Sequence, residues 1–419
     1  MQKGSPHHRS HPPLLVIFWV LIGFFCFGCL QAPGNHSFTT DAPTIRTPSG
    51  TFTSPPTSYP SIAPNENNST YYVSTSGNDS SLGSQAQPWQ TIQKAVDTAS
   101  AGDTIIVLAG DYPEAISVDK SGIRLIAEDK VSMRGFFVTG NDNLIRGFTV
   151  TNPSSNFGIR VTGNNNIIEK NDISNTGQDG IWFFGSGNKF TGNYIHDIVD
   201  RSKITYDPHV DCFQTTGPAE NIIFEKNVCN HTSTDGSNQI LMLTNNNPPV
   251  RNILFRNNIF IMHDPGYSPM NFVWREGQEE ISGMSVINNT IVHMNGIGNH
   301  AIRFINITGA YAANNIFIDY GNQNTSYILV EGGSDIHISN NAVYKSDGIP
   351  PKGGIFPNDL WMPELGLVDY RNLNFHLLNS SPLIDQGLTT TSVTDDFEGH
   401  PRPLGAGYDI GAFEYSISP

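Results

Sequence analysis

Short apolar stretches with a regularly placed asparagine dominate the pattern of this 419-residue chain. The motif apolar-x-x-Asn-x-apolar occurs seven times, first as IEKNDI (168–173) and last as ISNNAV (338–343). Successive motif asparagines lie 22, 34, 31, 31, 26 and 26 residues apart. Apolar strands repeated at such periods are typical of a solenoid whose coils stack on one another. The motif asparagines are Asn171, Asn193, Asn227, Asn258, Asn289, Asn315 and Asn341.

A second short strand accompanies these motifs and alternates apolar with other residues. Period-two alternation in short repeated strands predicts the coils of a parallel β-helix. Asparagines stacked at one corner of such coils can hydrogen-bond along the helix axis and satisfy polar groups that the turn would otherwise bury. The second strands are GIRVTG (158–163), GIWFFG (180–185), DCFQTT (211–216), QILMLT (239–244), NFVWRE (271–276) and AIRFIN (301–306).

The alternation also assigns side chains to an inner and an outer face. We expect Cys212 to point inward with Gln214 beside it as a structural polar plug, whereas Asp211 and Phe213 point outward. The remaining inward positions are Ile159, Ile181, Ile240, Phe272 and Ile302. The expected outward positions include Arg160, Trp182, Phe184, Thr215, Gln239, Leu241, Leu243, Asn271, Val273, Arg275 and Arg303.

The outer face has the residue types that recognise a sugar polymer. Successive coils are ~4.8 Å apart, which is comparable to the length of one sugar residue. Trp182, Phe184 and Phe213 can stack on sugar rings, and Arg160, Arg275 and Arg303 can pair with carboxylates. The alternative is that the long loops cover these side chains and that no ligand is involved.

The N-terminus predicts export. Lys3 and Arg9 precede the apolar run LLVIFWVLIGFFCFG (14–28), and Cys29 follows it. The run is short for a bilayer span and has the charge order of an export signal. Lipidation of Cys29, plain cleavage and an uncleaved anchor all remain open, and all three place the rest of the chain outside the cytoplasm. Any contact with the membrane is expected through this anchor alone.

Composition defines the remaining regions and excludes one class of partner. Residues 30–70 are rich in Pro, Thr and Ser and are predicted to form a disordered linker. The net charge of −15 argues against binding to nucleic acid, because that binding rests on neutralising phosphates. Cys212 and Cys229 are the two cysteines after the signal, and we expect buried thiols rather than a disulfide. We expect a monomer.

The chain resembles the secreted right-handed parallel β-helix proteins of the pectate-lyase-like superfamily. The resemblance lies in the repeats, in the opening segment 71–118 and in DDFEGHPRPLGAGYDIGAFEY (395–415). It implies an all-β fold over 71–415, with an N-terminal cap (71–118) and a closing segment (350–415). In the cap, Pro88 stands near the start of a short helix and Gly102 follows its end. The resemblance does not specify a reaction, since such folds host many functions.

The tetrapeptide YDPH (206–209) resembles the Asp-Pro-His motif of mannuronan C5-epimerases and related alginate lyases. The resemblance implies that His209 and a tyrosine exchange the C5 proton of a uronate while Asp207 helps to organise the site. The family's tyrosine lies five residues before the histidine, where this chain has Ile204, and Tyr206 lies three residues before it. We therefore expect His209 as base, Tyr206 as acid, and Asp207 or Asp211 as organiser.

Proton abstraction also needs a cation that neutralises the substrate carboxylate. Lys203, Arg201, Arg160 and Arg275 are the candidates. Asp179, Asp207, Asp211 and Asp235 could instead hydrolyse a glycoside or hold Ca²⁺, with Asn271 or Gln239 as an oxygen ligand. GNDSS (77–81) and Asp395–Asp396 are expected to be turns rather than metal loops.

The leading hypothesis is a lyase or C5-epimerase that acts on an acidic polysaccharide. The second is a non-catalytic protein that binds a cell-surface glycan or has a structural role, in which His209 only holds its loop closed.

Overall fold

The computed structural model describes residues 68–151, 153, 157–198, 209–232, 237–244, 249–263, 268–274 and 281–416. The side chains of His209, Ser237 and Asn238 are outside this description. All described residues belong to one compact unit, Thr53–Pro419.

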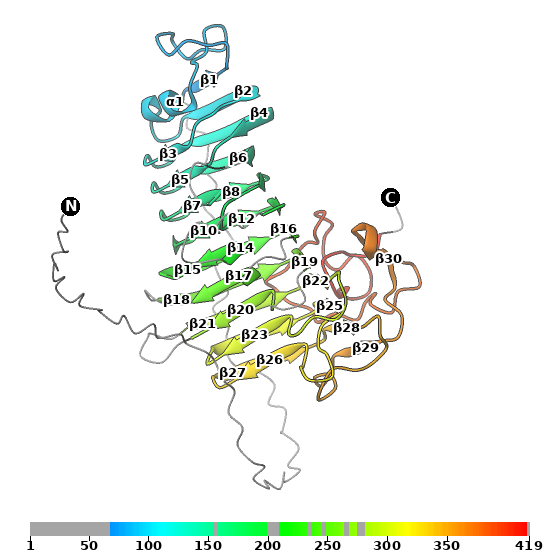
Figure 1. Ribbon diagram of the computed structural model, residues 1–419. Coiled ribbons are helices and arrows are strands. Elements are labelled where there is room, and N and C mark those ends of the chain that lie inside the picture. Colours follow the sequence, from blue (N-terminus) through cyan, green and yellow to red (C-terminus); the bar gives the residue numbers. More distant parts are fainter. Residues whose placement is uncertain are drawn as a thin grey trace, which may run out of the picture. The chain divides into compact units, whose positions relative to one another are not determined.

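The described strands form the stacked coils of a parallel β-helix, an all-β fold, as the repeats predict (Figure 1). One face is a nine-stranded parallel sheet in which each strand pairs with the equivalent strand of the next coil. Its strands are β3 (Ile116–Val118), β5 (Phe136–Val138), β7 (Ile159–Val161), β10 (Ile181–Phe183), β14 (His209–Thr215), β17 (Ser237–Thr244), β20 (Met270–Val273), β23 (Ile302–Ile305) and β26 (Ile328–Glu331).

A twenty-stranded sheet forms two further rows, which are joined because β6 pairs with both β8 and β9. One row consists of β1 (Thr70–Val73), β2 (Thr104–Asp111), β4 (Arg124–Met133), β6 (Leu144–Thr151), β8 (Ile167–Glu169), β11 (Gly185–Ser186), β12 (Lys189–Thr191), β15 (Ala219–Glu225), β18 (Val250–Arg256), β21 (Ile281–Ile287), β24 (Thr308–Ala313) and β27 (Ser334–Ser339). The other consists of β9 (Asp172–Ser174), β13 (Tyr194–His196), β16 (Val228–His231), β19 (Ile259–Met262), β22 (Thr290–His293), β25 (Ile316–Ile318), β28 (Ala342–Tyr344) and β29 (Leu360–Met362).

The motif asparagines form a continuous ladder at the corner between these two rows, which confirms their predicted role. The side chain of Asn258, for example, accepts the backbone N–H of Asn227 at 3.0 Å and donates to Asn289 at 2.8 Å. The ladder ends where Asp359 accepts the backbone N–H of Asn341 at 2.8 Å. The residue before each asparagine has a positive φ, which turns the chain sharply at that point. These residues are Lys170, Gly192, Lys226, Asn257, Asn288, Asn314 and Asn340.

A second, shorter ladder was not predicted from the sequence. Asn143, Asn166 and Asn188 are fully buried, and each of the last two accepts the backbone N–H of the asparagine one coil earlier. It covers fewer coils than the first ladder, so its period is weaker in the sequence.

The coil interior is packed with aromatic and branched side chains. Phe190, Phe224 and Phe255 stack in successive coils, with ring centroids 4.8 and 4.7 Å apart. All three are fully buried. Burying one such side chain stabilises a fold by roughly 1.5–3 kcal/mol, so the repeated column contributes at every coil.

The first coils are covered by α1 (Ile92–Thr98), the short capping helix that the sequence predicts. Thr91 caps it by accepting the backbone N–H of Lys94, and Ile92, Ala95 and Val96 are its buried face. Asp79 holds the preceding turn by accepting the N–H groups of Gln90 and Thr91, so GNDSS is a turn, as expected.

Cys212 and Cys229 form a disulfide, so the prediction of free thiols is wrong. Their Cα atoms are 6.2 Å apart, within the range that a disulfide spans. Seventeen residues separate them in the sequence. The coil nevertheless brings β14 and β16 side by side, which sequence separation alone does not reveal.

The C-terminal segment returns along the corner turns of earlier coils. It contains β30 (Leu367–Asp369), the 3-10 helix η2 (Tyr370–Asn372) and β31 (Asn374–Leu377). Lys226 forms an ion pair with Asp395 at 2.5 Å, and Asn288 donates to the carbonyl oxygen of Asp409 at 2.9 Å. Among the described residues, no helix has the length and hydrophobicity needed to cross a membrane.

Candidate polysaccharide-binding face

The outer face of the nine-stranded sheet carries one row of side chains in lateral register. Arg160 pairs with Trp182, Trp182 with Gln214, and Gln214 with Met242. Met242 then pairs with Asn271, and Asn271 pairs with Arg303. At ~4.8 Å per coil, the five steps from Arg160 to Arg303 span roughly 24 Å. We call these six residues the outer row.

The register corrects the predicted orientation of β14. Ile181 pairs with Phe213, so Phe213 belongs to the inner face and is fully buried against Phe224. The prediction that Phe213 binds substrate is therefore wrong. Gln214 pairs with Trp182 and lies on the outer face, so the inward polar plug is also wrong.

The difference between the predicted and the observed orientation of β14 has a physical cause at the corner where the straight part of this strand begins. The pairing of β14 with β17 is interrupted between Asp211 and Phe213. Two consecutive side chains, Cys212 and Phe213, are both fully buried there. Strict period-two alternation does not apply across such a corner, so the inward and outward positions that we derived from it were offset. For the same reason Thr215, Leu241 and Leu243 are buried instead of facing outward.

The N-terminal end of the outer row is an aromatic cluster that holds an arginine. The guanidinium of Arg160 lies 4.8 Å from the Trp182 ring centroid and 5.8 Å from that of Phe184. Phe157 packs on Trp182 at 4.9 Å. Arg160 and Trp182 are half-buried. Their Nε and Nε1 atoms are buried without a hydrogen-bond partner, which is an unfavourable state for a polar group.

The C-terminal end of the row is more polar. Arg303 donates to the side-chain oxygen of Asn271 at 3.2 Å. The amide of Asn271 in turn donates to the carbonyl oxygen of Ser268 at 2.7 Å. Asn271 is 2% exposed, so it positions Arg303 and offers little surface of its own.

Two acidic side chains lie buried beside the row. Asp179 and Asp211 are 2% and 1% exposed, and Asp179 accepts the backbone N–H of Asp211 at 3.2 Å. Gln239, 6% exposed, lies in register with Asp211 on the next coil. This burial excludes Asp211 and Gln239 from the open surface on which we predicted them. The pair of aspartates instead fixes the start of β14, two residues after His209.

Several predicted site residues stay untested. Lys203, Tyr206, Asp207, Arg275 and the lipidation candidate Cys29 lie outside the described residues, as do Arg201 and Asp235. The backbone of His209 lies in β14, in register with Ser237, but its side chain is not described. Among the described residues, the one group of three or more potential metal ligands is Asp396, Glu398 and His400, which is not part of this face.

The comparisons agree with this architecture. Residues 71–263 match the family model described as "Pel9A-like, right handed beta helix region". The solved structure of pectate lyase Pel9A matches with a TM-score of 0.58 and 18% identity, covering 83% of this chain and 96% of that one. A rhamnogalacturonan lyase matches with a TM-score of 0.46 and 16% identity, covering 66% and 81%. No protein with a curated description matches the sequence.

The coils, the asparagine ladder and the matches to the Pel9A-like family model and to the Pel9A structure define a right-handed parallel β-helix protein. Within that class, residues 71–263 are similar to the Pel9A-like family, and the fold of the chain is similar to that of pectate lyase Pel9A. At this level of identity, the structural match shows a shared fold and not a shared reaction.

Proposed function

We propose that this protein acts on an acidic polysaccharide, as a lyase or a C5-epimerase, outside the cytoplasm. The observation that carries the proposal is the outer row, in which side chains from six successive coils lie in register on one face. Arginines stand at both of its ends, and an aromatic cluster surrounds the first of them. Such a row fits a linear polymer with carboxylates and sugar faces along its length.

Arg160 is suited to a uronate carboxylate, because its guanidinium lies against the rings of Trp182 and Phe184, which restrict its orientation. Arg303 has a comparable role at the other end, where Asn271 holds it. The roughly 24 Å between them would take about five sugar residues at ~4.8 Å each. Two fixed cations at this separation would select for a polymer with several charges.

The reaction would start with removal of the C5 proton of a uronate by His209. A base near neutral pKa suits this step, and a neighbouring cation stabilises the charge that develops on the carboxylate. In a lyase, the C4–O bond then breaks and a C4=C5 double bond forms. In an epimerase, the proton returns to C5 on the opposite face. Tyr206 is the proposed acid, with Asp207 or Asp211 as organiser and Lys203, Arg201, Arg160 or Arg275 as the neutralising cation.

Location outside the cytoplasm is part of the proposal. It is supported by the apolar run 14–28 with its preceding Lys3 and Arg9. The Cys212–Cys229 disulfide adds to this support, because disulfides persist mainly in oxidising compartments. Lipidation of Cys29 would tether the protein to the outer face of the membrane.

One observation favours the second candidate, a non-catalytic glycan-binding protein. The outer row itself contains Arg, Trp, Gln, Met and Asn, and none of these is a proton-abstracting group at neutral pH. Catalysis therefore depends on the segment that ends at His209, whereas binding needs only the row.

The test is incubation of the purified protein with pectate and with alginate. Ultraviolet absorbance detects unsaturated chain ends, and NMR detects inversion at C5. We expect one of these signals with one polymer, and we expect His209→Ala to abolish it while binding persists. His337→Ala, which changes an exposed histidine on β27, is the matched control and should leave the signal unchanged. Binding without either signal would support the second candidate, and an unchanged reaction with His209→Ala would remove His209 from the mechanism.

A further inference from the structure

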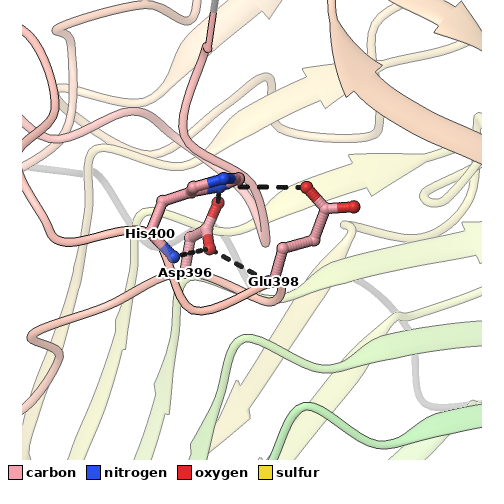
Figure 2. Close-up of side chains that lie close together, drawn as sticks. All are labelled: Asp396, Glu398 and His400. Atoms are coloured by element: carbon pink, nitrogen blue, oxygen red, sulfur yellow. Dashed lines mark hydrogen bonds and ion pairs between the residues drawn. The ribbon is translucent and has the colours of Figure 1, made fainter. Parts of the chain in front are cut away.

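The closing segment contains a cluster of polar side chains that bind one another and the backbone of that segment. Asp396, Glu398 and His400 point toward one another in one loop (Figure 2). Oδ1 of Asp396 accepts three backbone N–H groups of the same loop, and its Oδ2 accepts the backbone N–H of Glu414. Nε2 of His376 lies 3.1 Å from Oε1 of Glu398. These contacts serve the packing of the closing segment, and we assign no ligand to them.

Aromatic side chains on the nine-stranded sheet are arranged differently, because they gather on its outer face. Their ring centroids follow one another at 6.5, 4.9 and 5.2 Å. All four rings are half-buried, whereas the strand residues Phe136, Val138 and Phe183 beside them are buried in the coil interior. We call this group the aromatic platform. It consists of Phe137, Phe157, Trp182 and Phe184.

The platform extends the outer row toward the N-terminus. Phe137 of β5 pairs with Arg160, so its ring lies one coil before the first arginine of the row. A second outer row lies beside it, because the backbone N–H groups of Thr139, Thr162 and Phe184 each donate to a valine one coil earlier, at 3.0, 2.8 and 2.8 Å. Thr139 is exposed and Thr162 is half-buried. Ring faces and hydroxyl groups therefore lie side by side, and these groups suit the C–H faces and the hydroxyls of a sugar.

The charges at this end of the sheet disfavour a carboxylate on the platform. Ser117 of β3 pairs with Phe137, and neither is charged, so Arg160 is the first cation of the extended row. Asp119 is exposed and follows β3 by one residue, which adds a negative charge at the same end. The ammonium group of Lys120 donates to two backbone carbonyl oxygens at the end of α1, at 2.6 and 2.9 Å. A carboxylate over the Phe137 ring would be partly desolvated with no cation of the row beneath it, which is costly.

We propose that the aromatic platform binds uncharged sugar units of the polysaccharide, next to a uronate whose carboxylate pairs with Arg160. The inference rests on the proposed function and narrows its substrate to a polymer that carries uncharged units beside uronates. The uncharged unit is a neutral sugar or a methyl-esterified uronate, because both offer C–H groups to the rings and hydroxyls to Thr139 and Thr162. The platform has this role whether the protein cleaves the polymer, epimerises it or only binds it.

Affinity electrophoresis of the full-length protein in gels of three polymers tests the platform. Polygalacturonate has a carboxylate on every unit, highly methyl-esterified pectin has few, and a rhamnogalacturonan backbone alternates neutral with acidic units. Phe137→Ala should weaken binding of one or both of the last two polymers about two- to tenfold and leave binding of polygalacturonate unchanged. A loss with methyl-esterified pectin alone identifies the esterified uronate as the bound unit, and a loss with rhamnogalacturonan alone identifies the neutral sugar.

Phe137→Leu keeps an apolar side chain in β5 without the ring, so it should show the same loss even if Phe137→Ala does not fold. Tyr194→Ala is the matched control, since this tyrosine is 38% exposed on β13 of the other sheet, and it should leave all three affinities unchanged. Circular dichroism and thermal unfolding check that each variant is folded. Unchanged affinities in the Phe137 variants, or an equal loss with all three polymers, would overturn the inference and leave the proposed function standing. Binding of none of the polymers by the wild type would overturn both.

Discussion

The asparagine ladder and the outer row follow the same coils, yet they use side chains in opposite ways. The ladder repeats one residue type, and each amide is fully buried and bonded to the next coil. The outer row changes at every coil, and two of its polar atoms, Nε of Arg160 and Nε1 of Trp182, are buried without a partner. The repeated asparagines form hydrogen bonds with the protein's own backbone, whereas the varied side chains of the outer row can interact with a ligand.

The difference shows where stability and function separate in this fold. Removing a ladder residue leaves groups unpaired in two neighbouring coils. Removing a side chain of the outer row changes a half-exposed surface above a core that stays packed. We therefore expect substitutions in the ladder to destabilise the protein and substitutions in the outer row to change its ligand binding.

The largest effect is expected for Asn258→Ala in the middle of the ladder. The change removes the acceptor of the N–H and of the side-chain amide of Asn227, and it removes the amide that donates to the carbonyl of Phe224 and to Oδ1 of Asn289. Each unsatisfied buried group costs about 1–3 kcal/mol, so the free energy of unfolding should fall by roughly 3–6 kcal/mol in urea titrations. Asn164→Ala, an exposed asparagine, should cost less than about 1 kcal/mol. Equal losses in the two variants would contradict a special role for the ladder.

A pH-dependent effect is expected beside the ladder at Glu225. Burial alone would raise the pKa of this carboxyl, but the charges of Arg256 and Lys189, each 2.5 Å away, lower it from 4.5 to about 2. Because the folded pKa is depressed, the stabilisation is present above about pH 4.5 and is lost as the pH falls through about 2. The shift corresponds to roughly 3 kcal/mol.

Glu225→Gln should therefore be less stable than the wild type by roughly 3 kcal/mol at about pH 7, with the difference narrowing toward about pH 2. Urea unfolding at several pH values measures this. Glu169→Gln is the matched control two coils earlier, because its partner Arg146 is 39% exposed, and it should cost at most about 1 kcal/mol. A difference that stays constant with pH would show that the ionisation of Glu225 is not the cause.

The smallest effect in free energy, but the most informative for function, is expected for Trp182 of β10, and its neighbour Phe183 is the comparison. Trp182 faces outward with Arg160, and Phe183 is fully buried against Phe224. Trp182→Ala should weaken binding of an acidic polysaccharide about tenfold, or ~1.4 kcal/mol, with little loss of stability. Phe183→Ala should lower stability by roughly 3–5 kcal/mol and leave the affinity of the folded protein unchanged. Affinity electrophoresis in pectate or alginate gels, with thermal unfolding, separates the two outcomes.

The sequence by itself determined the architecture, because the asparagine motif that marks each coil occurs seven times. An apolar pattern of period two and an asparagine at each corner are local signals, and each copy confirms the others. The capping helix and its turn at Asp79 were also readable, since Thr91 and the apolar residues of α1 act within a few positions of one another.

Tertiary structure alone decided which face of the coil some side chains lie on and which distant residues are in contact. Alternation cannot be followed through a corner where Cys212 and Phe213 are both buried, so Phe213 and Gln214 were assigned to the wrong faces. The Cys212–Cys229 disulfide and the cluster of His376 with Glu398 join residues 17 and 22 positions apart, and no local pattern specifies such contacts. Strand period is set by the neighbouring peptide units, whereas register and long-range contacts are set by how successive coils pack against one another.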